Sequence, residues 1–437
     1  KDETAVCNLA SISLKSCLEY INYNDYEFII YSKNSCIYCK AAINFCNKYN
    51  IKYNIKSYKS ILLTNEEPIH VKFPQIYLKD NIKQSHIGGF TDLERFFRPT
   101  FNYDKLIYIT KIITNNLNNV IDYNYYPDLK TKNSNFKHRP IGIGIQGLAN
   151  VFYEMKISFD SNEAKLINKN IFETIYYAAL QKSMEISRDR QKIIQNYKLL
   201  INIKEKNNIN NLELLKNKYN ILDDEINRDE YLGSYSSFIG SPIYNGELQF
   251  DMWNVEVNND LHNWSDLRNN IKLYGIRNSL LVAPMPTAST SQILKNYECF
   301  EPIISNIYSR RVLAGEYTVI NNYLINDLKL FNLWNSELKD KLIINDGSVQ
   351  NLDIPDFIKN RYKTAWEIKQ KDIIDMAIDR GAFICQSQSL NLFQENPNFK
   401  KLTSMHFYSW KNGLKTGMYY LRTRPSSKAI QFSVNPE

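Results

Sequence analysis

The chain has 437 residues, of which 43% are hydrophobic, and a formal net charge of +8. At roughly 150 residues per domain, this length predicts two or three domains with a large core. No apolar run approaches the ~18 residues of a membrane helix, and the start has no apolar signal-peptide core. We therefore expect a soluble protein in the cytoplasm, which for a viral protein means the host cytoplasm.

The first residue, Lys1, and the basic charge suggest two further expectations. A start at Lys rather than Met favours a fragment, a processed product or one half of a split gene. The positive charge comes with abundant Lys, Asn, Ile and Tyr throughout, and no basic face is evident. This pattern indicates biased composition rather than a nucleic-acid surface, although a diphosphate pocket would also suit it.

Seven cysteines are too few, and too odd in number, for a secreted disulfide framework, so reduced thiols are expected. Cys36 and Cys39 form the single C-x-x-C, which is either redox-active or half of a zinc site. Zinc would need two more ligands, and Cys46, His70 and His86 lie at no recognisable ligand spacing. The motif therefore favours redox chemistry, and no metal is predicted.

The cysteine pair stands at a predicted strand-to-helix junction. A β-rich run over 26–31 leads into Cys36, and apolar residues from Ala41 to Tyr49 recur at helical spacing. At a helix N-terminus, free N–H groups and the helix dipole lower a thiol pKa from ~8.5 into the range of roughly 3.5 to 7.5. Cys36 is thus the predicted nucleophile, and Cys39 the thiol that closes the disulfide.

Three further patterns complete this segment. Alternation over 51–56 predicts a strand, 73–78 a strand opened by proline, and 88–93 a glycine turn entering a helix. With the cysteine motif, residues 24–98 resemble a glutaredoxin of thioredoxin-like fold. The resemblance implies a cis proline and a glutathione site, although Phe73 replaces a small β-branched residue and Ile37 a proline. The implied glutathione-binding residues are Lys33, Phe73, Pro74, Gly88, Gly89, Thr91 and Asp92.

The block 138–148 contains Gly142, Gly144 and Gly147 as a literal G-x-G-x-x-G. By itself this would suggest a dinucleotide site, but the preceding residues 133–139 are polar and predict no strand. The glycines more plausibly permit close backbone packing.

Four blocks outside the cysteine segment resemble the large subunit of class I ribonucleotide reductases. They are Val-Cys-Asn-Leu-Ala-Ser-Ile-Ser-Leu at 6–14, the block at 138–148, Tyr-Gly-Ile-Arg-Asn-Ser-Leu-Leu-Val-Ala-Pro-Met-Pro-Thr-Ala-Ser-Thr at 274–290, and Gly-Met-Tyr-Tyr-Leu-Arg-Thr-Arg-Pro at 417–425. The resemblance implies the second half of a ten-stranded α/β barrel with a glutaredoxin-like domain inserted after its first strand. The expected domains are 1–20, 24–98 and 99–437, the last with a variable surface helical extension over 190–232.

A buried-strand run over 280–283 leads into a hydroxyl-rich loop ahead of a helical stretch. Hydroxyls and free N–H groups at a helix N-terminus can hold an anion, or Thr287 and Ser289 can simply cap the helix; the residues leave both readings open. The resemblance implies that this loop holds the diphosphate of the substrate through Pro286, Thr287, Ala288, Ser289 and Thr290.

The resemblance also assigns Cys7, Tyr419 and Tyr420, whose residue types alone would indicate packing. Cys7 matches one member of the substrate-reducing dithiol, and the two tyrosines match a pair that relays the radical. This sequence does not contain the second cysteine of the dithiol, the radical cysteine of the Asn-Leu-Cys-x-Glu loop with its glutamate, or the carboxyl-terminal shuttle cysteines. Cys299 and Cys385 stand where the family has other residues and are expected to be buried bystanders.

The implied function is ribonucleoside-diphosphate reduction, with glutathione as reductant of the inserted domain. The implied partners are the N-terminal half with the radical cysteine, a small subunit with the radical cofactor, and a second reassembled large subunit. A tether of about ten residues, each spanning at most ~3.5 Å, predicts electron delivery in cis at an effective concentration of about millimolar. The alternatives are a stand-alone glutathione-dependent thiol-disulfide oxidoreductase with the barrel half as docking scaffold, or a non-catalytic assembly module.

Overall fold

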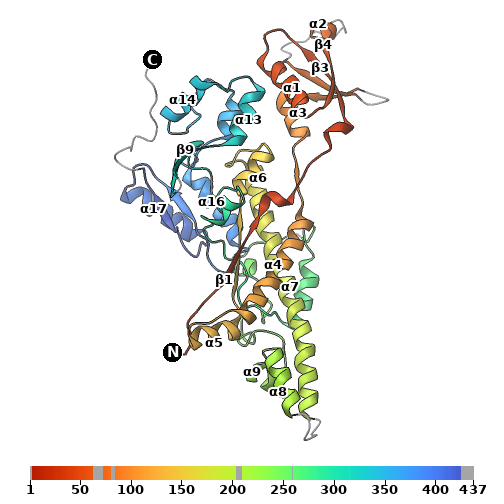
Figure 1. Cartoon of the computed structure of the whole chain (residues 1–437), viewed down its shortest axis with the longest axis vertical. Coiled ribbons are helices and arrows are strands. Elements are labelled where there is room, and N and C mark those ends of the chain that lie inside the picture. Colours follow the sequence, from red (N-terminus) through yellow and green to blue (C-terminus); the bar gives the residue numbers. More distant parts are fainter. Residues whose placement is uncertain are drawn as a thin grey trace.

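The computed structural model describes residues 2–62, 72–79, 84–202, 209–257, 259–313 and 315–424. Figure 1 shows an elongated molecule with the segment 24–98 at one end and a long helix extending toward the other. Within the described ranges, no helix is both long enough and apolar enough to cross a membrane.

A pair of parallel strands lies at the centre of the molecule. β1 (Asn8–Ser13) pairs with β8 (Ile141–Gln146) from Asn8 opposite Ile141 to Ser13 opposite Gln146. Side chains alternate between the two faces of a strand, so the isoleucines of β8 point to one face and its glycines to the other. All three isoleucines are fully buried, which identifies their face as the one that packs on the core.

The segment 280–284 continues the sheet on the other edge of β8. Ala283 N–H donates to Ile143 O at 3.0 Å, and Gln386 N–H then donates to Val282 O at 3.2 Å. A further parallel pair follows in β11 (Asn391–Phe393) and β12 (Tyr420–Arg422). Parallel strands separated in sequence by helices confirm the expected α/β fold of this part of the chain.

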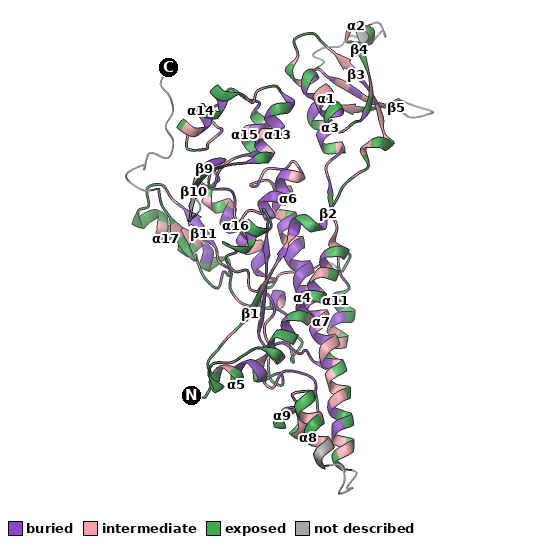
Figure 2. Ribbon diagram, in the orientation of Figure 1, coloured by how far each residue is buried: buried purple, intermediate pink, exposed green. Residues whose placement is uncertain are grey.

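Helices cover the parallel strands. α4 (Tyr103–Tyr123) contacts β1 and β8, and α7 (Asn162–Asn202) packs along α4. Buried residues concentrate where these helices meet β1 (Figure 2). The other elements are α5 (Leu129–His138), α6 (Leu148–Glu154), α8 (Ile209–Lys218), α9 (Asp223–Asn227), α10 (Gln249–Met252), α11 (Trp264–Tyr274), α12 (Thr290–Ile293), β9 (Ile307–Val312), β10 (Gly315–Ile320), α13 (Asn322–Leu330), α14 (Ser336–Ile344), α15 (Asp356–Arg361), α16 (Gln370–Gly381) and α17 (Phe399–Lys411).

The chain leaves and re-enters this α/β part through a narrow neck. After η1 (Leu14–Cys17), β2 (Leu18–Glu19) pairs antiparallel with β7 (Thr100–Phe101). Because the two strands of the neck pair with each other, the chain between them leaves the α/β part and returns to it at the same place. β1 before the neck and α4 after it both belong to the α/β part. We call residues 24–98 the inserted unit.

The inserted unit is built on a four-stranded sheet of order β4-β3-β5-β6. β3 is parallel to β4 and antiparallel to β5, which is antiparallel to β6. The strands lie close to where the sequence predicts them. The elements are η2 (Tyr23–Asp25), β3 (Glu27–Ser32), α1 (Ile37–Lys48), β4 (Lys52–Ser57), α2 (Lys59–Leu62), β5 (Gln75–Lys79), β6 (Gln84–Gly88) and α3 (Phe90–Phe96).

Aromatic side chains fasten the inserted unit to α13 and α15. Tyr38 and Phe90 pack edge-on against Phe331, with ring centroids 5.5 and 5.1 Å apart. Phe357 lies beside the same two rings at 6.4 and 6.2 Å. Tyr38 stands between Cys36 and Cys39, so the cysteine motif itself takes part in the docking.

A buried ionic network lies beside this aromatic cluster. Arg361 is 3.1 Å from Glu94 of the inserted unit and 2.6 Å from Asp327, which is also 2.6 Å from Lys156. Glu94, Asp327 and Arg361 are all buried. Burial by itself would raise the pKa of Asp327, but the charges of Lys156 and Arg361 outweigh it and lower that pKa.

The extension over 190–232 contains the end of α7 with α8 and α9, and it is not confined to the surface. Glu225 in α9 is fully buried and pairs with Arg190 at 2.7 Å and Arg277 at 2.8 Å. Burial opposes its ionisation, yet the two guanidinium groups hold the pKa of Glu225 at about 2. The expectation of a surface extension is therefore wrong at this residue, whose partner Arg277 is remote in sequence.

The ionic network should contribute strongly to stability. Arg361→Met leaves the Glu94 carboxylate buried opposite an apolar side chain, and breaking a buried pair in this way costs ~3–5 kcal/mol. We expect the free energy of unfolding, measured in urea, to fall by about that amount.

Arg188→Met is the matched control, because Arg188 pairs with Asp189 on the surface. Such exposed pairs contribute only about 0–1 kcal/mol. Equal losses for the two variants would contradict a stabilising role for the network.

Candidate functional site

Cys7 lies one residue before β1 and is exposed. Gln386 Nε2 lies 3.9 Å from its sulfur. Protein atoms around the thiol remove part of its water, which raises the pKa of Cys7. The side chain is therefore a neutral thiol at neutral pH, which is the form that can give up a hydrogen atom or a proton and electron.

The glycines of β8 make room beside Cys7. A Cβ on Gly142 would lie 2.4 Å from Leu9 Cδ2 and 3.3 Å from Cys7 Sγ, and one on Gly144 would lie 2.9 Å from Met285 Sδ. Close packing, the reason predicted for these glycines, is therefore confirmed. Both lie within β8, and Gly147 starts α6 with φ +83°. The G-x-G-x-x-G pattern thus spans a strand and a helix start rather than a phosphate loop between them.

The hydroxyl-rich loop follows segment 280–284. Thr287 is buried, and its Oγ1 accepts the N–H of Cys299 at 2.8 Å. Pro286, Ala288, Ser289 and Thr290 are exposed. The helical stretch expected after the loop is only the four-residue α12, and Ser289, at its N-cap, makes no side-chain cap hydrogen bond. Helix capping thus accounts for neither hydroxyl: Thr287 anchors the loop, and Ser289 presents its hydroxyl to solvent.

Asn296 ties this loop to the central strands. Its Nδ2 donates to Ser13 Oγ at 2.8 Å and lies 3.3 Å from Gln146 Oε1. Gln146 Nε2 in turn donates to Ser11 Oγ at 2.8 Å. Sequence reasoning quoted the blocks that contain Ser11, Ser13 and Gln146 but gave these side chains no role, and it missed Asn296, which lies in no motif.

Tyr419 and Tyr420 stand at the start of β12. Their ring centroids are 4.4 Å apart, with the planes inclined at 68°, and both side chains are about half exposed. The hydrogen bond to Tyr420 raises the pKa of Tyr419. Arg422 lies over the Tyr420 ring at 5.0 Å. Two phenols in contact, with solvent on one side, can exchange an electron and a proton.

Behind this tyrosine pair lies a carboxyl group that the sequence did not single out. Asn391 Nδ2 donates to Glu301 Oε1 at 2.6 Å, and Asn391 Oδ1 accepts the N–H of Tyr420 at 3.1 Å. Burial, together with the charge of Glu298, raises the pKa of Glu301 to about 7. Glu301 therefore changes charge near neutral pH, one side chain away from the backbone of Tyr420.

The second thiol centre caps α1. Cys36 is half-buried, and its sulfur accepts the N–H of Cys39 at 3.2 Å. Cys39 is buried, and burial, with the contact to Cys36, raises its pKa to about 11. The Cys36 thiol also lies 3.5 Å from Phe73 O, and the Phe73–Pro74 peptide bond is cis.

The other residues predicted to bind glutathione lie on the same unit. Gly88 has φ +125°, and a Cβ there would meet Asp92 Oδ2 at 2.4 Å, so only glycine fits. Asp92 Oδ2 accepts the N–H of Gly89 at 2.9 Å, which fixes this turn at the start of α3. Lys33 and Thr91 are exposed. His70, weighed as a zinc ligand, lies outside the described residues, among which no cluster of three or more metal-ligating side chains occurs.

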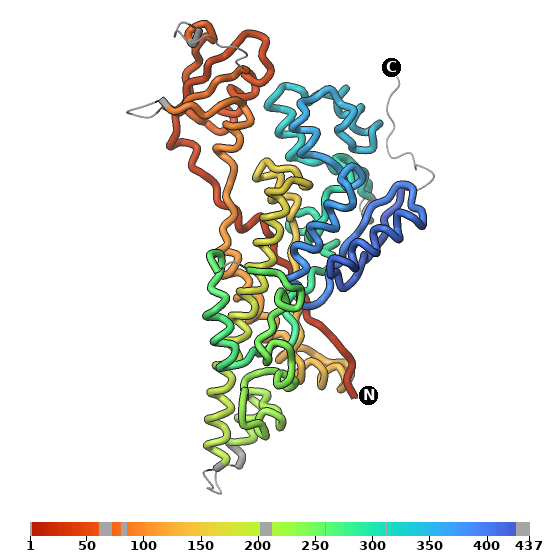
Figure 3. Tube along the Cα trace, turned by 180° about the vertical axis from the view of Figure 1, so that it is seen from behind, coloured from red at the N-terminus to blue at the C-terminus, as the bar shows by residue number. Residues whose placement is uncertain are grey.

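The structure keeps the two thiol centres apart. Cys7 directly precedes β1, which runs through the middle of the molecule, whereas α1 lies in the inserted unit at one end (Figures 1 and 3). β1 alone has six residues and spans about 20 Å. The short tether expected between the centres therefore does not bring them into contact in this arrangement.

The titration of Glu301 predicts a pH-dependent stability. Its pKa of about 7 exceeds its ordinary value of 4.5, so folding favours the protonated form. This stabilisation is complete below the unfolded pKa and is lost as the pH rises through the folded pKa. As the pH is raised from about 4.5 to 7.5, the urea midpoint of the wild-type chain should therefore decrease more than that of Glu301→Gln, which cannot titrate at this position. Glu230→Gln, at an exposed position, is the control and should follow the wild-type chain. If the midpoints of the wild-type chain and Glu301→Gln changed in parallel with pH, the raised pKa of Glu301 would be refuted.

Comparison with known proteins identifies the α/β part. The family described as "Ribonucleotide reductase, barrel domain" matches residues 89–420, and the match does not extend over 24–88. The ribonucleoside-diphosphate reductase large subunit of Dictyostelium discoideum is 52% identical over 402 residues, covering 91% of this chain and 41% of that protein. That of Caenorhabditis elegans is 50% identical over 346 residues, covering 78% and 38%.

A solved structure, the Actinobacillus ureae class Id ribonucleotide reductase alpha subunit, is similar with a TM-score of 0.48 and 23% identity, over 72% of this chain and 46% of that one. The chain spans about two fifths of the length of the two large subunits above. On the sequence matches, the chain belongs to the ribonucleotide reductase large-subunit family and carries its barrel domain.

Proposed function

We propose that this chain takes part in the reduction of ribonucleoside diphosphates to deoxyribonucleoside diphosphates, as the C-terminal part of a class I large subunit. The observation that carries the proposal is that three features adjoin parallel strands of the α/β part, which include the pairs β1–β8 and β11–β12. Cys7 precedes β1, the exposed hydroxyls follow segment 280–284, and the tyrosine pair begins β12. The family membership supports the same assignment.

In this proposal the loop 286–290 holds the diphosphate of the substrate. Ser289 and Thr290 offer exposed hydroxyl donors, and Pro286 and Ala288 are exposed beside them. Thr287 acts from within, since its bond to Cys299 N–H fixes the loop. Hydrogen bonds to charged groups are the stronger class, so uncharged donors can hold a phosphate.

Cys7 would supply one thiol of the reducing pair, and the N-terminal half of the large subunit would supply the other along with the radical cysteine. Loss of the 2′ hydroxyl as water requires two electrons, and the two thiols provide them by becoming a disulfide. Tyr419 and Tyr420 would pass the radical from a small subunit carrying the radical cofactor. A homodimer of reassembled large subunits in the cytoplasm completes the proposal.

We further propose that the inserted unit is a glutaredoxin-like domain that uses glutathione. Its support is the half-buried Cys36 over a buried Cys39, the contact of the Cys36 sulfur with Phe73 O, and the Gly88 turn. The Cys36 thiolate attacks Cys7 in the disulfide, which breaks the bond between Cys7 and its partner cysteine, forms a Cys36–Cys7 mixed disulfide and releases the partner as a thiolate. Cys39 then displaces the reduced Cys7, and two glutathione molecules reduce the Cys36–Cys39 disulfide while forming oxidised glutathione.

Delivery in cis would require movement of the inserted unit. Exchange needs contact between the two sulfurs, and α1, which Cys36 caps, lies in the docked unit at one end of the molecule, away from β1. The neck consists of two paired strands, β2 and β7, that are each two residues long. It can therefore act as a hinge once the contacts of Tyr38 and Glu94 with the barrel part are released.

The second candidate function is a stand-alone glutathione-dependent thiol-disulfide oxidoreductase with the barrel part as docking scaffold. The docked position of the unit favours it, because Cys36 is half-exposed there while being remote from Cys7. A glutathione-dependent disulfide assay on the whole chain, with no N-terminal half present, tests this candidate directly.

The 437-residue chain, with small subunit and reductant only, should make no deoxynucleotide, because the radical cysteine loop is not in its sequence. Product should appear when a separately supplied N-terminal half is added. Turnover without that half would refute the proposed division of labour.

In the reconstituted enzyme, Ser289→Ala with Thr290→Ala should weaken diphosphate binding by about one order of magnitude or more, since bonds to charged groups contribute roughly 1.5–3 kcal/mol each. Ser336→Ala, an exposed serine in α14, is the control. Substrate affinity that matches the control would show that the loop does not hold the phosphates.

With glutathione as the sole reductant, Cys36→Ser should abolish multiple turnover and spare the first, pre-reduced turnover. Cys39→Ser should allow a mixed disulfide through Cys36 to be trapped. Cys46→Ala, a buried thiol in the same helix, is the control and should turn over normally. Full multiple turnover by Cys36→Ser without added glutaredoxin would eliminate delivery in cis.

A further inference from the structure

A cavity of about 380 Å³ lies between α7, the segment around α10 and the strand segment 279–281. Its size falls within the ~300–1,000 Å³ of small-molecule sites. Cys7 and the hydroxyl loop are not among its lining residues, so it is separate from the site described above. Its walls are mostly apolar, with Leu180, Ile243, Trp253, Ile276, Leu280 and Leu281 among them.

One wall carries a buried hydrogen-bond donor with no partner. Gln249 is 4% exposed, and its Nε2 makes no hydrogen bond within the described part of the chain. The orientation of the amide is fixed by its neighbour, because the Lys415 ammonium, 3.4 Å from Oε1, can only donate. An unsatisfied buried N–H costs ~1–3 kcal/mol, which an acceptor in the cavity would recover.

Lys415 adds a positive charge to the same wall. Among the described residues, the oxygens that its ammonium contacts belong to uncharged groups: Ile384 O at 3.0 Å, Cys385 O at 2.7 Å and Gln249 Oε1 at 3.4 Å. Loss of water around the ammonium lowers the pKa of Lys415. The longest of these three contacts, to Gln249, is the one that an incoming anion would replace.

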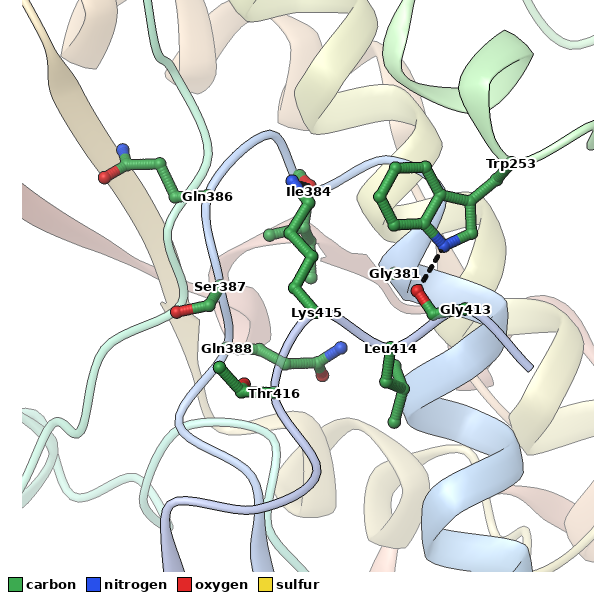
Figure 4. A pocket seen from close by; sticks show the side chains of 10 residues that line it. All are labelled: Trp253, Gly381, Ile384, Gln386, Ser387, Gln388, Gly413, Leu414, Lys415 and Thr416. Atoms are coloured by element: carbon green, nitrogen blue, oxygen red, sulfur yellow. Dashed lines mark hydrogen bonds between the residues drawn. The ribbon is translucent and has the colours of Figure 1, made fainter. Parts of the chain in front are cut away.

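The short loop that carries Lys415 is held in place. Trp253 Nε1 donates to Gly413 O at 2.6 Å, as Figure 4 shows in the small adjoining pocket that shares Trp253 and Lys415. Glu247 and Lys415 both line the cavity and are both exposed, so water screens the charge of each. Lys415 is the one whose ammonium is held on the wall, through Ile384 O and Cys385 O.

Cys385 gives the cavity a chemical reporter. It was expected to be a buried bystander, but it is half-buried and lines the cavity. Its sulfur accepts the N–H groups of Leu281 and Val282 at 3.0 and 3.1 Å, which holds the side chain against the strand. A ligand in the cavity would cover this sulfur.

We propose that this cavity binds a small amphipathic carboxylate, whose apolar body fills the space between α7 and the strand segment and whose head group meets Gln249 Nε2 and Lys415. A diphosphate fits less well, because the wall offers a single cation and is otherwise largely apolar. The site is independent of the function proposed above.

Octanoate is the probe, titrated calorimetrically into the full chain with 1-octanol as the neutral comparison. Octanoate should bind to the wild-type chain at one site. Octanol should bind to the wild-type chain about tenfold more weakly, and so should octanoate to Lys415→Met, because each comparison removes one charge-assisted hydrogen bond. Lys411→Met, an exposed lysine at the end of α17, is the matched control. Octanol binding as tightly as octanoate, or no change in Lys415→Met, would overturn the proposal.

A second measurement needs no variant. Saturating octanoate should slow the alkylation of Cys385 by iodoacetamide, followed by peptide mass spectrometry, and leave the rate at Cys36 unchanged. An unprotected Cys385 would place the bound octanoate elsewhere and refute the assignment.

Discussion

The backbone pairing of β1 with β8 is the constraint on which the remaining architecture depends. It joins residues 8–13 to residues 141–146 and is made by six matched positions. Cys7 precedes the first of these positions, and the neck of the inserted unit follows the last. Segment 280–284, which leads to the hydroxyl loop, pairs with the other edge of β8. A change in this register would move Cys7 and the hydroxyl loop relative to each other. If β8 shifted by one residue, its glycines would face the core in place of its isoleucines.

Alternation along β8 makes that register specific. Its isoleucines are fully buried on the helix-covered face, while Gly142 and Gly144 leave space for Cys7, Leu9 and Met285 on the other. A side chain at either glycine would meet atoms closer than real Cβ contacts allow. The glycines are thus explained by the crowding of one sheet face, and a phosphate-binding turn is not needed to account for them.

The sequence predicted the elements whose signals are local and missed the contacts that depend on distant residues. Cys36, Cys39 and the glycine turn at Gly88 have patterns readable within a few residues, and each lies in the element expected. Asn296, Asn391 and Glu301 carry no local signal, because their roles arise from partners more than 80 residues away. The same reason explains the burial of Glu225, since a charged residue in a polar helix gives no sign of two distant arginines.

Docking and the proposed redox chemistry would share residues in the inserted unit. Tyr38 lies between the two cysteines and packs on Phe331 and Phe357, and the charge of Asp356 also reaches its hydroxyl. The start of α1, which carries Tyr38 and is capped by Cys36, therefore lies against α13 and α15. In the proposed function, a small thiol such as glutathione would react with the half-buried Cys36 sulfur in the docked position, whereas a disulfide on a large protein would have to fit beside these two helices or displace them. The surface that holds the unit in place would thereby also determine which disulfides Cys36 can contact.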